Sequence, residues 1–276
     1  MIDELHYQGE FVLYKRLEQA RGIELRVAKA RAGALAPSDF EPLVDRRTRL
    51  VSVALVSHQN GFRHDLKPLA DLAHAHGAWL YTDAIQAVGM VPVDVRASGV
   101  DALCAGTYKW LLGGFGTAPF FVRREILDRI VPDRWGALHV AKDLGNHRYE
   151  IHRSAKKFEY ATLAFGAVYQ LGAGLAYLDR IGVPRIEAHT VALAHHLRDG
   201  LAARGLTPLT PAGNRSSIVS FRTPGEPAKL QRALREAGID VSHRENGTQV
   251  RVSPALFNTT EDIEAFLRAV EPVSNR

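Results

Sequence analysis

The sequence predicts an α/β fold, in which a large domain with a mainly parallel sheet is followed by a small C-terminal α+β domain. Short apolar runs rich in β-branched residues alternate with helical patterns through the first half of the chain. A long helical stretch follows at 162–181, and shorter strands and helices alternate after it. We place the domain boundary within that helix, so that the domains cover 1–165 and 166–276.

The predicted strands of the large domain are Leu50–Val56, Ala78–Tyr81, Ala102–Ala105 and Ala118–Val122. Between them, residues 66–76 place leucines and alanines on one helical face and end at Gly77, and Ala84–Val88 also has a helical pattern. Strands and helices that alternate at this spacing are typical of parallel strands joined by crossover connections.

The C-terminal part begins with a predicted helix at Pro184–Arg204. Its remaining elements are strands near Ile218–Phe221, Val241–His243 and Val250–Val252, and helices near Ala228–Ala237 and Glu261–Val270. Strands and helices of this length favour a small α+β domain.

Composition excludes several classes of protein. The single cysteine, Cys104, excludes an internal disulfide and a zinc cluster, and we predict no metal site. No apolar run approaches the ~20 residues of a membrane span. The opening MIDELHYQGEF is no signal peptide, so we expect a cytoplasmic protein. The net charge of +5 comes with no nucleic-acid-binding motif, and we predict no nucleic-acid partner.

Two residues between 79 and 117 point to chemistry. Asp83 follows a predicted strand, and in an open parallel sheet ligands bind at the carboxyl ends of strands. By itself Asp83 could also be a helix N-cap. Lys109 follows the next strand, lies between Tyr108 and Trp110, and precedes a glycine-rich turn. A partly dry site would favour the neutral amine that imine formation needs, although a lone lysine here could be a surface residue.

Taken in order, the motifs resemble those of the class V aminotransferase family of pyridoxal-phosphate (PLP) enzymes. The segments that carry the resemblance are SHQNGFRHDLKPLADLAHAHGA, DAIQ, GTYKWLLGGFG, KFEYATLAFG and VRVSPALFNTTEDIEAFL. The family has the fold-type I architecture and includes cysteine desulfurases, kynureninase and isopenicillin-N epimerase. The resemblance implies PLP as cofactor, a PLP-binding large domain at 1–165 and a homodimer.

The resemblance also implies roles around the cofactor ring. Lys109 would form the Schiff base, and Asp83 would pair with the pyridinium nitrogen. Gln86 would hydrogen-bond the phenolic oxygen, and His58 falls where many relatives carry an asparagine near that oxygen. His6 matches the histidine that stacks on the cofactor face, although a histidine near a terminus is usually a surface residue.

Phosphate and substrate contacts are implied in the same way. Thr107 and Tyr108 stand where many relatives have Ser-x-His, and the Thr107 hydroxyl would donate to the phosphate. Thr162 matches a threonine that the family lends to the partner subunit. Arg251 would hold the carboxylate of a small amino-acid substrate through two parallel hydrogen bonds.

The expected function is PLP chemistry at the α-carbon of an amino acid, with transamination, β-elimination and epimerisation all open. The loop at 242–250 contains no cysteine, so we expect that the protein is not a cysteine desulfurase. We expect Cys104 to be a buried small hydrophobe. The alternative is an inactive fragment or pseudoenzyme that keeps the fold without catalysis.

The match begins inside the family's large domain, so the chain resembles an N-terminally truncated member. The family's first segment supplies a glycine- and threonine-rich loop at a helix N-terminus, which holds the phosphate. Without a counterpart to it, we expect the chain alone to bind PLP poorly.

Overall fold

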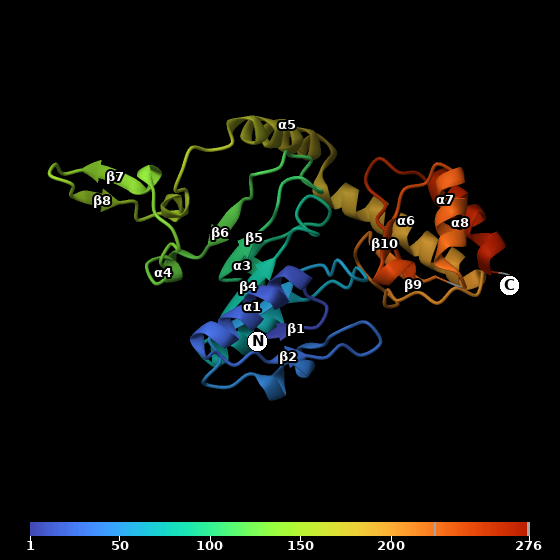
Figure 1. Ribbon diagram of the computed structural model, residues 1–276, viewed down its shortest axis with the longest axis horizontal. Coiled ribbons are helices and arrows are strands. Elements are labelled where there is room, and N and C mark those ends of the chain that lie inside the picture. Colours follow the sequence, from blue (N-terminus) through green and yellow to red (C-terminus); the bar gives the residue numbers. More distant parts are fainter. Residues whose placement is uncertain (224, 275–276) are drawn as a thin grey trace.

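The computed structural model describes residues 1–223 and 225–274 and confirms the α/β fold with a mainly parallel sheet. Figure 1 shows this sheet, in blue to green, beside a smaller C-terminal domain in orange and red. The two parts are connected by the consecutive helices α5 (Phe165–Ile181) and α6 (Val183–Ala203). The boundary at 165 and 166 stays a prediction.

The large sheet has the strand order β2-β1-β3-β4-β5-β6, and all neighbours are parallel except β5 and β6. Its strands are β1 Ile2–Asp3, β2 Val27–Ala28, β3 Leu50–Ala54, β4 Trp79–Asp83, β5 Ala102–Cys104 and β6 Phe120–Val122. Ala54 pairs with Asp83, which pairs with Cys104, so three central strands end level at one edge.

Helix α2 (Leu66–Ala75) forms as predicted. Asp65 caps its N-terminus by accepting a hydrogen bond from the Lys67 amide, and its leucine and alanine face is buried against the sheet. The pattern at Ala84–Val88 instead forms overlapping turns that continue to Val91. Gly89 within them has a φ of 96°, which is outside the helical range, and a side chain there would collide with the Trp110 carbonyl.

Several elements escape the sequence patterns. Helix α1 (Gln8–Arg21) buries none of its residues, so no periodic apolar face marks it. A hairpin of β7 (Val140–Asp143) and β8 (Tyr149–Ile151) projects from the side of the molecule away from the C-terminal domain. The short helices are α3 Val95–Ser98 and α4 Arg124–Leu127, with 3₁₀ turns at Pro37–Asp39, Glu41–Leu43, Ala137–His139, Ala155–Phe158 and Glu245–Gly247.

The C-terminal domain has the antiparallel strand order β10-β11-β9, and two helices pack with α6 around its core. Its elements are β9 Val219–Arg222, α7 Pro227–Glu236, β10 Ser242–Arg244, β11 Gln249–Val252 and α8 Thr260–Ser274. These match the predicted elements closely. In the described part of the chain, no helix is both long and apolar enough to cross a membrane.

Hydrogen bonds tie the loop after β3 to the C-terminal domain. Ser220 and Gln249 donate to the carbonyl of Gln59, at 2.5 and 2.8 Å. Ser216 donates to the carbonyl of Gly61 at 2.6 Å, and Thr210 donates to that of Asn60 at 2.8 Å. The loop that begins at His58 is therefore held by the C-terminal domain.

Candidate active site

A cavity of about 170 Å³ lies at the carboxyl edge of the large sheet. Its lining residues are the last residues of β3 and β4 and residues of the loops that follow β1, β3, β4 and β5. Five of them were predicted from sequence. The lining consists of Tyr7, Ala54, Val56, His58, Asp83, Ile85, Gln86, Tyr108 and Lys109. The expected ring-binding groups, apart from His6, therefore meet in one place.

Lys109 is half-buried in this wall, and burial is the main cause that lowers the pKa of its amine. The Arg251 guanidinium lowers that pKa further, while the Asp83 carboxylate opposes both. The ring of Tyr108, stacked on Phe115 with centroids 4.7 Å apart, lies 5.8 Å from the Lys109 amine. This environment favours the neutral, nucleophilic form of the amine.

Asp83 and Gln86 are oriented by neighbouring hydrogen bonds. The Ile85 amide donates to Asp83 Oδ1 at 3.0 Å, which holds the carboxylate at the end of β4. The Trp110 indole donates to Gln86 Oε1 at 3.0 Å, so the Gln86 NH₂ group is left as the donor. A carboxylate beside an amide donor suits a protonated ring nitrogen and a phenolic oxygen.

His58 is buried and neutral. Arg244 donates from Nη2 to His58 Nε2 at 3.1 Å, which leaves the ring proton on Nδ1. Burial lowers the pKa of His58 to about 3, with further lowering by Arg244, Arg251 and Lys109. The Tyr7 ring meets the imidazole edge-on, with centroids 5.1 Å apart.

Three predicted residues lie elsewhere. His6 is 0% exposed and lies beneath the carboxyl edge of the sheet. Its Nδ1 accepts a hydrogen bond from the Tyr7 amide, and its Nε2 lies 3.1 Å from Ser52 Oγ. Tyr7 lines the cavity in place of His6. The Thr107 hydroxyl donates to the carbonyls of Gly114 and Thr117, at 2.6 and 3.0 Å. Its proton is therefore used within the turn and not offered to a phosphate. Thr162 is exposed outside the cavity.

Arg251 borders the site without lining the cavity. Its Nη1 donates to the His58 carbonyl at 2.9 Å and its Nη2 to Ser242 Oγ at 3.0 Å. Its Nε is buried and has no partner among the described residues. A buried donor without a partner costs free energy.

Sequence reasoning missed Tyr7 and Arg244. Tyr7 directly follows His6, and an aromatic residue at the end of the first strand was the available signal. Arg244 shares one face of the β10–β11 pair with Arg251, because Ser242 pairs with Arg251 and Arg244 lies two residues further along the strand. Because side chains alternate between the two faces of a strand, the segments SHR and QVRV would have predicted that Arg244 and Arg251 share a face.

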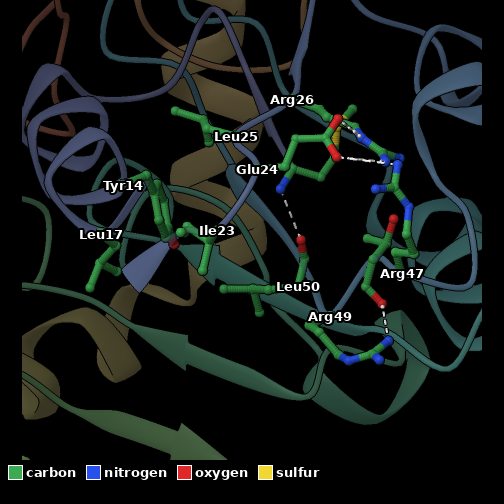
Figure 2. Close-up of a pocket in the computed structure, with 12 residues that line it drawn as sticks. Tyr14, Leu17, Ile23, Glu24, Leu25, Arg26, Arg47, Arg49 and Leu50 are labelled. Carbon is green, nitrogen blue, oxygen red and sulfur yellow. Dashed lines mark hydrogen bonds and ion pairs between the residues drawn. The ribbon is translucent and has the colours of Figure 1, made fainter. Parts of the chain in front are cut away.

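A second cavity and the single cysteine do not offer a comparable set of reactive groups. A larger cavity, about 420 Å³, lies beside the end of α1 (Figure 2). Arg26 and Arg47 pair there with Glu24, at 2.8 and 3.2 Å, and Arg49 donates to the carbonyls of Arg46 and Thr48. Cys104 Sγ lies 2.8 Å from the Tyr81 hydroxyl, and burial raises the pKa of its thiol. Raising that pKa disfavours a reactive thiolate.

Known proteins resemble the chain over nearly its whole length. The family model described as aminotransferase class-V matches residues 1–266. A probable cysteine desulfurase of Methanothermobacter thermautotrophicus is 29% identical over 99% of this chain and 72% of its own length. A probable cysteine desulfurase of Mycolicibacterium paratuberculosis is 30% identical over 99% of this chain, which spans only 42% of that relative.

A solved structure agrees with these relatives. The apo cysteine desulfurase of Thermococcus onnurineus superposes with a TM-score of 0.90 at 26% identity, over 99% of this chain and 72% of that one. The likeness includes the large sheet, the connecting helices and the C-terminal domain.

The expectation that the chain is not a cysteine desulfurase is wrong, because relatives and a structural neighbour that cover the whole chain are of that type. That expectation relied on a loop without cysteine. Similarity over 99% of the chain outweighs the absence of one residue type from a nine-residue loop. The loop is thus a poor guide to the reaction.

The comparisons confirm the remaining family-level expectations: the fold, the dependence on PLP and an enzyme of this class. The residues that line the cavity supply the groups that the cofactor ring requires. With a family model that covers 1–266, the chain belongs to the aminotransferase class-V family.

Proposed function

We propose that this chain acts as a cysteine desulfurase, which uses PLP to break the carbon–sulfur bond of cysteine. The observation that carries the proposal is the convergence of Lys109, Asp83, Gln86 and His58 on one cavity at the sheet edge. Relatives named as cysteine desulfurases, similar over 99% of the chain, support the choice of substrate.

When bound, PLP supplies an electron sink for charge that develops at the substrate α-carbon. Asp83 would keep the ring nitrogen protonated, and the Gln86 amide would donate to the phenolic oxygen. Lys109 would hold the cofactor and, once released by substrate, would carry a proton to and from the α-carbon. Its lowered pKa suits that task, since a base must be neutral to accept a proton.

The substrate would lie between Lys109 and Arg251, with its carboxylate held by the Arg251 guanidinium. The sulfur must then leave to an acceptor. Because the loop at 242–250 has no cysteine and Cys104 is hydrogen-bonded to Tyr81, we propose a thiol from solution as the acceptor. Cysteine and a thiol R–SH would give alanine and R–S–SH, which balances every atom.

We also propose that the enzyme is a cytoplasmic homodimer. Helix α5 exposes several large apolar side chains, among them Phe165 and Tyr169, which are 56% and 77% exposed. An apolar helical surface of this kind is typical of a protein interface. Thr162 is exposed three residues before the start of this helix, where a partner subunit could reach it. The single cysteine is a free thiol, which suits a reducing compartment.

The test is sulfide release from L-cysteine by the PLP-supplemented protein with dithiothreitol as acceptor. Wild-type protein should release sulfide, and Lys109→Ala should not. Lys142→Ala, which changes an exposed lysine of β7, is the matched control and should keep the wild-type rate. Wild-type protein that carries PLP on Lys109 but releases no sulfide would refute the proposal.

A further inference from the structure

Trp110 directly follows Lys109 in the sequence, and its side chain contacts Gln86. The indole N–H donates a hydrogen bond to Gln86 Oε1 at 3.0 Å. An indole can donate a hydrogen bond but cannot accept one, whereas a carboxamide has an oxygen that accepts and a nitrogen that donates. The contact therefore forms with only one of the two orientations of the Gln86 amide.

The surroundings of Gln86 leave the Trp110 contact in control of that orientation. Gln86 is 4% exposed, so water has little access to its amide. With the oxygen turned toward Trp110, the amide nitrogen keeps its donors for the cavity that Gln86 lines. Trp110 is not among the residues that line this cavity, so its influence on a bound group would pass through Gln86.

The backbone of Trp110 is held by the same turn. Gly89 lies three residues after Gln86, and a Cβ on it would collide with the Trp110 carbonyl, so the two backbones are in direct contact. The Trp110 ring is half-buried and packs against the core of the large domain. The turn that carries Gln86 thus fixes Trp110 at its backbone and at its indole, and the orientation of the amide is set before PLP binds.

A fixed donor at Gln86 has a consequence for bound PLP. The proposed function places the phenolic oxygen of the ring beside the Gln86 amide and joins PLP to Lys109 through a nitrogen that can carry a proton. That proton shares the negative charge of the phenolic oxygen, and once it leaves, the oxygen depends more strongly on other donors. A donor from Gln86 therefore favours loss of the proton and lowers the pKa of the linking nitrogen.

We propose that Trp110 is a positioning residue, which turns the Gln86 amide so that it donates to the phenolic oxygen of PLP. Through this orientation Trp110 sets the pH at which the nitrogen between PLP and Lys109 loses its proton. This role rests on the proposed function, which places the PLP ring beside Gln86.

The test follows the visible absorbance of Lys109-bound PLP against pH, since this absorbance changes when the linking nitrogen loses its proton. Trp110→Phe should move the midpoint up by about one pH unit, the order expected for loss of one hydrogen bond. Trp79→Phe changes a half-buried tryptophan at the opposite end of β4 from Asp83 and should keep the wild-type midpoint. A midpoint that stays in place or moves down in Trp110→Phe would overturn the inference.

A double-mutant cycle tests whether Trp110 acts through Gln86. Gln86→Met removes the amide from a side chain of similar length and should raise the midpoint by itself. In that background Trp110→Phe should add no further shift, because the amide that Trp110 orients is gone. Trp110→His keeps a ring N–H at a similar distance from the backbone and should stay closer to the wild-type midpoint than Trp110→Phe. Shifts that add in the double variant would refute the role assigned to Trp110.

Hydrogen exchange tests the contact in cofactor-free protein, and it does not depend on the folding of a Trp110 variant. The indole proton of Trp110, followed by NMR, should exchange with deuterium about 10-fold or more slowly in wild type than in Gln86→Met. The indole proton of Trp79 should exchange at the same rate in both proteins. Equal rates for Trp110 in the two proteins would contradict the contact with Gln86.

The outcomes separate the role of Trp110 from the proposed function. A shifted midpoint in Trp110→Phe without sulfide release from cysteine by wild type would refute only the desulfurase. Sulfide release with an unshifted midpoint in Trp110→Phe would refute only the role of Trp110.

Discussion

Arg251 and His58 are joined by a 2.9 Å hydrogen bond from the guanidinium to the backbone carbonyl, across the boundary between the C-terminal sheet and the large sheet. The same histidine accepts a hydrogen bond from Arg244. Side chains of the C-terminal domain therefore hold one wall of the cofactor cavity. This arrangement lets contacts at the substrate end influence the position of a residue beside Lys109.

Removing this contact should destabilise the fold. Arg251→Gln leaves the His58 carbonyl without its charged donor, and such bonds are worth about 1.5–3 kcal/mol. The free energy of unfolding in urea should fall by about that amount. Arg222→Gln, an exposed position on β9, is the control and should change stability by less than about 0.5 kcal/mol. Equal stability of Arg251→Gln and wild type would contradict the structural role.

The reactivity of Lys109 should shift in opposite directions when its charged neighbours are neutralised. Asp83 raises the pKa of Lys109, so Asp83→Asn should move the midpoint of amine acylation to lower pH. Arg251 lowers that pKa, so Arg251→Gln should move the midpoint to higher pH. Acylation of cofactor-free protein, followed at Lys109 by peptide mass spectrometry, measures both. Shifts of the same sign in the two variants would be inconsistent with this electrostatic picture.

Two glycines of α5 should respond differently to alanine. A Cβ on Gly174 would lie 2.5 Å from the Leu111 carbonyl oxygen, in the loop that follows Lys109. Gly174→Ala should therefore destabilise the protein by about 1–3 kcal/mol and disturb the loop. Gly172 has nothing within 4 Å, so Gly172→Ala should stabilise the helix by about 0.5–1 kcal/mol. Thermal melts of the two variants should move in opposite directions.

The Thr107 hydroxyl should matter to the loop more than to the phosphate. Thr107→Val removes the donor to two carbonyls in a fully buried position and should cost about 1–3 kcal/mol of stability. Thr107→Ser keeps the hydroxyl and should lose less. If Thr107→Val weakened PLP binding at unchanged stability, the hydroxyl would instead be a phosphate ligand.

The sequence predicted most of the fold, because parallel strands and amphipathic helices have strong periodic signals. The strands β3, β4 and β5 and the helix α2 lie close to their predicted bounds. Helix α1 was missed because none of its residues is buried, and the hairpin of β7 and β8 because it is mostly exposed. Their positions depend on tertiary contacts and not on local pattern.

The sequence predicted those residues of the cavity whose positions depend only on the end of one strand. Asp83 and Lys109 follow strands β4 and β5, whose ends lie level at one edge, whereas Gln86 was placed by the family resemblance. His6 and Thr107 were placed in the site by resemblance, but local hydrogen bonds to Ser52 and to the carbonyl of Gly114 engage their side chains. The contact between Arg244 and His58 joins residues far apart in the sequence, which no local pattern could reveal.

The most direct test of the account is product analysis of cysteine turnover. L-Cysteine, PLP and dithiothreitol are incubated with the protein, and alanine, pyruvate and sulfide are quantified together by NMR and a colorimetric assay. The account predicts alanine and sulfide in equal amounts, with both lost in Lys109→Ala. Pyruvate in place of alanine, or no product from protein that carries PLP on Lys109, would contradict it.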